Sequence, residues 1–157
     1  MTKPPTSKLY DGPLTSHAGF WLRFVSNHVS GAVRHKLAGK GIAVAEWALM
    51  RSLFEHGEVA PSQLAVQLGM TRGGITKIAD KLLARSLVFR IPDAGDGRAH
   101  ALSLTAAGRR LVPILARLAD DNDREWFGHL QPETVASLTK ILRDIVEHHR
   151  LRTVPIE

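Results

Sequence analysis

Between residues 62 and 104 the spacing of apolar residues changes from a helical to a strand-like period, which constrains the fold more than any other feature of the sequence. Residues 71–82 carry apolar positions at the i, i+3, i+4 and i+7 spacing of a helix with one buried face, namely Ile75, Ile78, Ala79 and Leu82. Residues 87–91 and 98–104 are strand-like, and turn residues fill the segment between them. The pattern predicts short helices followed by a β-hairpin.

A further short helix is predicted just before residue 70. Pro61 suits its first turn and Gly69 marks its end. Thr71 is positioned to cap the next helix, because its hydroxyl can accept a hydrogen bond from an unpaired backbone N–H two or three residues on. Two short helices joined in this way form a helix-turn-helix, whose second helix enters the DNA major groove while the first spans the backbone.

The second of these helices has a polar face opposite its apolar stripe. This face presents bare backbone at Gly73, a hydroxyl at Thr76 and ammonium groups at Lys77 and Lys81, which suits the major groove. An exposed face of any globular protein would carry similar residues, and the ordered motifs around this one favour DNA. Asp80 would repel phosphate, so it is predicted to orient a nearby lysine or an arginine of the β-hairpin, the wing of the motif, instead.

At these residues the sequence resembles the MarR family of winged helix-turn-helix regulators, named for multiple antibiotic resistance. The resemblance covers residues 46–108, and its strength lies in the order and spacing of several motifs. They are Ser62-x-Leu64-Ala65-x-x-Leu68-Gly69, Ile75-Thr76-x-x-Ala79-Asp80-x-Leu82, Leu87-Val88-x-Arg90, Asp93-x-x-Asp96-x-Arg98 and Leu104-Thr105-x-x-Gly108. The sequence departs from the pattern at Ser86, where many members have glycine, and at Gly95 and Gly97, where many have wing arginines.

The resemblance implies a mainly α fold, in which a winged helix-turn-helix with a two-stranded β wing joins a dimerisation lobe of N- and C-terminal helices. It also implies a sequence-specific transcriptional regulator that binds a pseudo-palindromic operator in double-stranded DNA as a homodimer. Repression relieved by a small aromatic or anionic ligand is the expected mode of action.

Site residues follow from the resemblance and from the chemistry of each side chain. The predicted DNA-binding residues, with Arg72 and Thr76 reading bases, are Ser62, Gln63, Thr71, Arg72, Gly73, Thr76, Lys77, Lys81, Arg90 and Arg98. Asp93 and Asp96 are predicted to fix the turn of the wing. A ligand pocket is predicted at His17, Trp21, Trp47 and Met50, although large apolar residues at helical spacing belong to a core more often than to a pocket.

Outside the motifs, composition shifts and helix signals divide the chain. We expect an irregular arm (1–13), a dimerisation helix (14–40), the winged region (42–104), a long helix with a C-terminal helix (105–149) and a tail (150–157). In the helix predicted for residues 43–56, Phe54 is expected to face inward with Leu53. The C-terminal helix has an apolar stripe with few partners in so short a chain, so pairing with a second copy is expected.

The distribution of charge also favours an acidic partner. The net charge is +6, and by segment it is +4 for residues 1–50, +4 for 51–110 and −2 for 111–157. Cysteine is absent, which excludes disulfides, thiolate metal sites and thiol-based peroxide sensing. The sequence has no apolar run long enough to cross a bilayer and no apolar signal core near its start, so a cytoplasmic location without membrane contact is expected.

An enzyme is not expected. The sequence has no Gly-rich phosphate loop after a strand, no nucleophile elbow and no His-Glu-x-x-His zinc motif, and no cofactor is predicted. Two alternatives to a specific regulator remain: a non-specific architectural or protein-binding winged helix, and a metal-responsive regulator. The second is disfavoured and no metal ligand is assigned, because adjacent His148 and His149 would point about 100° apart on a helix.

Overall fold

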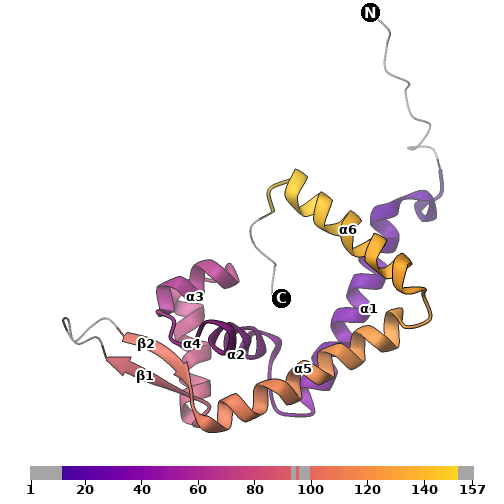
Figure 1. Ribbon diagram of the computed structural model, residues 1–157. Coiled ribbons are helices and arrows are strands. Elements are labelled where there is room, and N and C mark those ends of the chain that lie inside the picture. Colours follow the sequence, from indigo (N-terminus) through magenta and orange to yellow (C-terminus); the bar gives the residue numbers. More distant parts are fainter. Residues whose placement is uncertain (1–11, 93–94, 96–99, 152–157) are drawn as a thin grey trace, which may run out of the picture.

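The computed structural model describes residues 12–92, 95 and 100–151. A 3₁₀ turn, Leu14–Ser16, precedes α1 (Ala18–Ala38), and the winged lobe follows with α2 (Val44–His56), α3 (Pro61–Leu68), α4 (Arg72–Ala84), β1 (Val88–Pro92) and β2 (His100–Leu104). The chain continues with α5 (Ala106–Phe127) and α6 (Pro132–His148). Figure 1 shows α2, α3, α4 and the two strands gathered in one lobe, from which α1 and α5 lead away towards α6. The predicted mainly α winged helix-turn-helix is confirmed.

Several sequence predictions fall outside the described residues. They concern Asp93, Asp96 and Arg98 in the wing, most of the N-terminal arm and most of the C-terminal tail.

Local capping sets the boundaries of the helix-turn-helix, as the sequence predicted. The Thr71 hydroxyl accepts a hydrogen bond from the backbone N–H of Gly74 at 3.0 Å and so caps α4. Gly69 ends α3 with a φ of 62°, a left-handed conformation that glycine adopts at low cost. The N–H of Met70 bonds the carbonyl of Ala65 at 2.9 Å, which closes the helix end and turns the chain into α4.

The wing is an antiparallel hairpin anchored to the linker before α3. Val88 pairs with Leu104 at its base, and Pro92 pairs with His100 at the far end of the described ladder. Val59 extends the ladder: its N–H donates to the Leu102 carbonyl at 3.1 Å, and the Leu102 N–H donates back at 2.9 Å. The linker, the hairpin and α3 are therefore held as one unit.

One hydrophobic core unites the winged lobe with the adjoining ends of α1 and α5. Its fully buried members are Leu37, Ile42, Leu49, Met50, Leu53, Leu64, Ile75, Leu82, Leu102, Val112 and Leu115. The four-residue stripe predicted for α4 is buried in it. The inward orientation predicted for Phe54 is wrong, because its side chain is 38% exposed and lies beneath the Arg51 guanidinium, 6.0 Å from the ring centroid.

A polar bridge fixes the C-terminal end of α4 to the turn between α1 and α2. Arg85 Nη1 donates to the Gly41 carbonyl at 2.5 Å and lies 3.9 Å from Glu46 Oε2. The same carboxylate oxygen of Glu46 accepts the backbone N–H of Ala43 at 2.9 Å. Because Glu46 is buried, these contacts satisfy its charge and set the orientation of α4 relative to α1.

The chain leaves α4 through Ser86, which has a φ of 56°. Its N–H bonds the Leu83 carbonyl at 2.9 Å and the N–H of Leu87 bonds the Leu82 carbonyl at 3.0 Å, the paired bonds of a left-handed helix cap. Serine thus occupies a left-handed position at which glycine would be unstrained.

Ser86→Gly is expected to raise the free energy of unfolding by about 0.5–1 kcal/mol, because the relief of left-handed strain exceeds the added entropy of the unfolded chain. Urea unfolding followed by circular dichroism measures the change. Ala84→Gly, in the last turn of the same helix, should instead lower it by up to about 1 kcal/mol. Destabilisation by both substitutions would contradict the strain assigned to Ser86.

The junction between the wing and α5 is tightly packed. The Thr105 hydroxyl accepts the N–H of Gly108 at 3.0 Å and donates to the Ser86 carbonyl at 2.7 Å. A Cβ atom on Gly108 would lie 2.1 Å from the Leu87 carbonyl oxygen. The Leu104-Thr105-x-x-Gly108 motif therefore describes a capped helix that starts in direct contact with the chain leaving α4.

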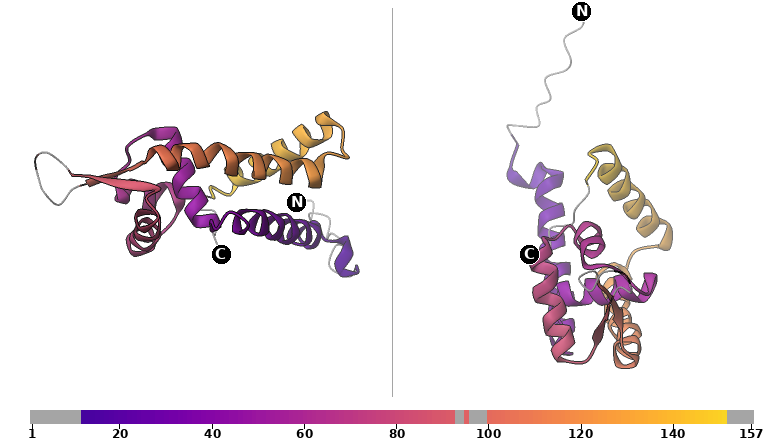
Figure 2. Two further views of the ribbon diagram at one scale, coloured as in Figure 1. Left: turned by 90° about the horizontal axis from the view of Figure 1, so that it is seen from below. Right: turned by 90° about the vertical axis from the view of Figure 1, so that its left-hand side faces the viewer.

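Beyond the winged lobe, α1 and α5 run side by side (Figure 2). The buried side chain of Asn122 joins them: its Nδ2 donates to the Val29 carbonyl at 3.3 Å, and its Oδ1 accepts from Lys36 Nζ at 2.9 Å. Lys36 also pairs with Glu125 at 2.6 Å. By contrast, α6 contains no buried residue, although its apolar stripe is continuous.

Candidate nucleic-acid interface

A groove between α3, α4 and the wing collects four of the residues predicted to bind DNA. Its volume is about 360 Å³. Ser62 lies at the start of α3, Arg72 and Thr76 lie one turn apart on α4, and Arg90 comes from β1. Three separate segments of the chain thus contribute hydroxyl and guanidinium groups to one surface.

The outer face of α4 is open along its length. Thr71, Arg72, Gly73, Thr76, Lys77 and Lys81 are all exposed. A Cβ built on Gly73 would meet no atom within 4 Å, so the backbone itself is accessible there. The Thr76 hydroxyl donates to the Arg72 carbonyl at 3.0 Å and is held against the helix.

Asp80 on α4 pairs with Arg90 on β1. The Arg90 Nη2 and Asp80 Oδ1 atoms are 2.7 Å apart, and both side chains are about half exposed, so the pair contributes little to stability. Its effect is to direct the arginine of the wing towards the recognition helix. This confirms the prediction that Asp80 orients a neighbouring basic group, here the wing arginine.

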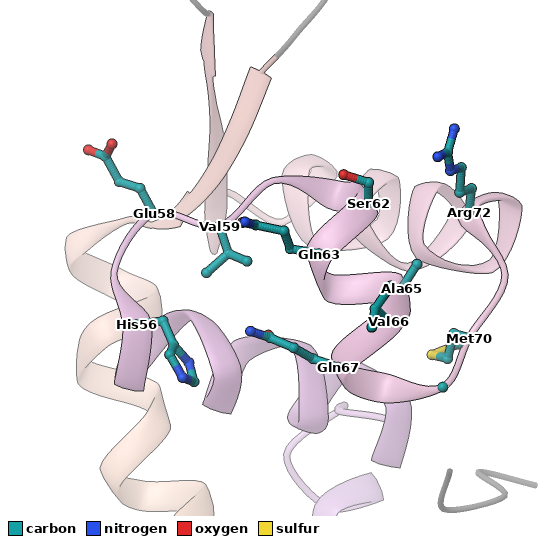
Figure 3. Close-up of a pocket in the computed structure, with 11 residues that line it drawn as sticks. His56, Glu58, Val59, Ser62, Gln63, Ala65, Val66, Gln67, Met70 and Arg72 are labelled. Atoms are coloured by element: carbon teal, nitrogen blue, oxygen red, sulfur yellow. The ribbon is translucent and has the colours of Figure 1, made fainter. Parts of the chain in front are cut away.

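A second hollow lies on the other side of α3 (Figure 3). It has a volume of about 970 Å³, with Ser62 and Arg72 along one edge and His56 and Gln67 along the opposite edge. Ser62 and Arg72 line both hollows, so they form the ridge between them. Gln63 also lines the second hollow, and its Oε1 accepts the Ala60 N–H at 3.4 Å, which leaves its amide NH₂ as the donor group.

His100 is a residue of the groove that the sequence did not single out. It lies at the start of β2, is half-buried and faces the groove together with Leu102. The alternation of side chains along the strand places these two residues on one face, which is the signal that could have identified it.

The four residues predicted to line a ligand pocket are distributed over two helices. His17 and Trp21 lie at the start of α1, whereas Trp47 and Met50 lie on α2 in the winged lobe (Figure 1). Met50 is completely buried in the core, and Trp47 lines a shallow hollow of about 430 Å³ with Val44 and Arg51. The Trp21 indole donates to the Thr15 carbonyl at 2.8 Å. Within one chain these four side chains do not form one cavity among the described hollows.

Two other classes of site were sought in the described part of the chain. Residues 12–92, 95 and 100–151 contain no group of three or more histidine, aspartate or glutamate side chains placed to hold a metal ion. None of the described helices is both long and apolar enough to cross a membrane.

Comparison with known proteins places this geometry in a family. Residues 40–99 match the MarR family model. CouR from Rhodococcus jostii RHA1, solved bound to p-coumaroyl-CoA, is 28% identical with a TM-score of 0.72, over 85% of this chain and 94% of that chain. The winged region of the chain, residues 40–99, is therefore of the MarR type.

Two further similar proteins extend the comparison beyond the winged lobe. The HTH-type transcriptional repressor NicR of Pseudomonas putida is 22% identical over 148 residues, which cover 93% of this chain and 94% of that protein. A mutant of MarR from E. coli complexed with operator DNA has a TM-score of 0.73 at 22% identity, over 89% of this chain and 99% of that chain. The likeness therefore includes the helices on both sides of the winged lobe.

Proposed function

We propose that this MarR-type protein is a sequence-specific DNA-binding transcriptional regulator that acts in the cytoplasm as a homodimeric repressor relieved by a small ligand. The groove between α3, α4 and the wing is the observation that carries the proposal. It joins an open helix face to a hydroxyl group from α3 and a guanidinium group from β1, and α4 has the exposure that a recognition helix in the major groove requires.

Within this interface we assign roles by chemistry. Arg72 and Thr76 read base edges, because they lie one turn apart on the exposed face of α4 near its start. Lys77 and Lys81 bind phosphates as point charges further along the same helix. Contacts to the backbone or the minor groove are assigned to Ser62, Gln63, Thr71, Arg90 and Arg98, with Asp93 and Asp96 shaping the turn of the wing.

The homodimer is proposed from the surfaces that one chain leaves uncovered. On α6, Leu138, Ile141, Leu142, Ile145 and Val146 are 36–55% exposed, and on α1 Trp21 and Phe24 are about half exposed. Among the described side chains, the Trp126 indole Nε1 is a buried donor without a hydrogen-bond partner. A second copy would cover these apolar surfaces and bring two recognition helices to successive major grooves about one turn apart.

The charges of the terminal helices support the same assembly. Helix α1 carries Arg23, Arg34 and Lys36 and no acidic residue. The segment from residue 111 to the end of the chain has a net charge of −2. Packing the terminal helices of two copies together would bring opposite charges to the interface.

We propose a small aromatic or anionic ligand as the signal, bound between the terminal helices and the winged lobe. The p-coumaroyl-CoA that is bound to CouR has both properties. Trp21, in edge-to-face contact with Phe20 and Phe24, offers aromatic surface at the start of α1, and His17 precedes it by one turn. On α2, Trp47 is the half-buried member of the predicted set and lines a hollow of its own. Relief of repression would follow if the ligand changed the spacing of the two winged lobes.

The experiment that tests the function is binding to DNA from upstream of the protein's own coding region, measured by fluorescence anisotropy across a salt series. Binding that survives scrambled competitor DNA, with a steep loss of affinity as salt rises, is the expected result. Binding that scrambled DNA competes away equally would instead assign the protein to the non-specific architectural class.

Gly73→Ala distinguishes an effect on stability from an effect on DNA binding. The added methyl meets no atom of the chain and replaces glycine in a helix, so the free energy of unfolding should rise by up to about 1 kcal/mol. The methyl would nevertheless stand between α4 and the wall of the DNA major groove. We therefore expect about tenfold weaker DNA binding, or about 1.4 kcal/mol. Paired urea unfolding and anisotropy measure both effects. If the stabilised variant bound DNA with unchanged affinity, the Gly73 face of α4 would not lie in the DNA major groove.

A further inference from the structure

The hydroxyl of Thr76 has a fixed hydrogen-bonding role within α4. It donates its only proton to the Arg72 carbonyl, 3.0 Å away, although the side chain as a whole is exposed. With the oxygen turned back onto the helix, the γ-methyl is the part of the side chain that remains to face outward.

The surroundings of this methyl leave room for a second methyl group. One turn earlier, the Cα of Gly73 has open space where a Cβ would stand. Ser62 and Arg72 line the same groove as Thr76 and supply its polar groups. The outward surface at Thr76 is therefore small, apolar and accessible.

The major groove presents one base with matching chemistry. Guanine offers only acceptors there, which a hydroxyl without a free proton does not satisfy, whereas thymine offers its C5-methyl group. We infer that Thr76 selects a thymine in each half of the operator through contact between its γ-methyl and the C5-methyl of the base. This inference rests on the proposed entry of α4 into the major groove.

The test uses the DNA that the full-length protein binds specifically, with each thymine of both half-sites replaced in turn by uracil, which removes only the C5-methyl. At one position, the same in both half-sites, the uracil substitution should weaken binding about fourfold for each half-site, which is the effect of one buried methyl group. If binding is sequence-specific but no uracil substitution changes the affinity, the inference about Thr76 is overturned and the proposed function stands. Loss of all sequence preference before any substitution would overturn the proposed function as well.

Two variants decide which part of Thr76 acts. Thr76→Ser keeps the hydroxyl and removes the methyl, so it should bind thymine and uracil operators equally. Thr76→Val keeps a methyl and removes the hydroxyl, so the discrimination should persist. The reverse pattern would show that the oxygen reads the base and would overturn the inference. Unfolding midpoints of both variants, measured beside the wild type, exclude a change in fold as the cause.

Discussion

Gly108→Ala is expected to lower the free energy of unfolding by about 2 kcal/mol, a large loss for one methyl group. The new Cβ would stand 2.1 Å from the Leu87 carbonyl oxygen and 3.1 Å from Leu104 Cδ2. The first obstacle is backbone, and this carbonyl also accepts the Thr105 N–H at 3.1 Å. Overpacking at about 3 kcal/mol therefore outweighs the gain of about 1 kcal/mol from alanine in a helix.

Urea unfolding measures this effect, and the Gly73→Ala variant is its matched control. Both changes put the same methyl on a helical glycine, but only Gly108 is in contact with another segment. Opposite shifts of the midpoint are expected. An unchanged midpoint for Gly108→Ala would mean that α5 does not approach the chain between α4 and β1 as closely as described.

Ile145→Glu is expected to dissociate the homodimer and to weaken operator binding by roughly 100-fold or more, because the two winged lobes would no longer bind as a linked pair. The side chain lies in the C-terminal half of the α6 stripe and is 43% exposed in one chain, so its replacement costs the single chain little. A glutamate buried at the interface would remain unpaired in the dimer.

Ala136→Glu provides the control, because residue 136 lies on the opposite, polar side of the same exposed helix. Sedimentation equilibrium gives the mass of each variant, and anisotropy gives its affinity for the operator. The control should remain a dimer that binds DNA. If Ile145→Glu also remained dimeric at wild-type affinity, the interface would lie elsewhere than on α6.

Sequence alone predicted the elements whose signals are local. Thr71 caps a helix because its hydroxyl needs only the N–H three residues on, and this cap is present. The buried stripe of α4 follows from its spacing in the same way. The partner of Asp80 was predicted only as one of several neighbouring basic side chains, because the pairing with Arg90 depends on how the hairpin packs against α4.

Other features depend on contacts between distant segments. Periodicity marked Met50 and Trp47 as apolar but could not separate the fully buried Met50 from the half-buried Trp47. Nothing local in the sequence joins Arg85 to the Gly41 carbonyl, since the contact spans 44 positions. His100 enters the groove only because β2 pairs with β1 in this register.

The central claim is that two copies of α4 enter successive major grooves of one operator. Hydroxyl-radical footprinting of the complex on the specifically bound DNA tests it most directly. Two protected regions are expected, related by a dyad and centred about 10 base pairs apart, with weaker protection of the flanking minor grooves by the wings. A single protected region, or uniform protection along the duplex, would contradict it.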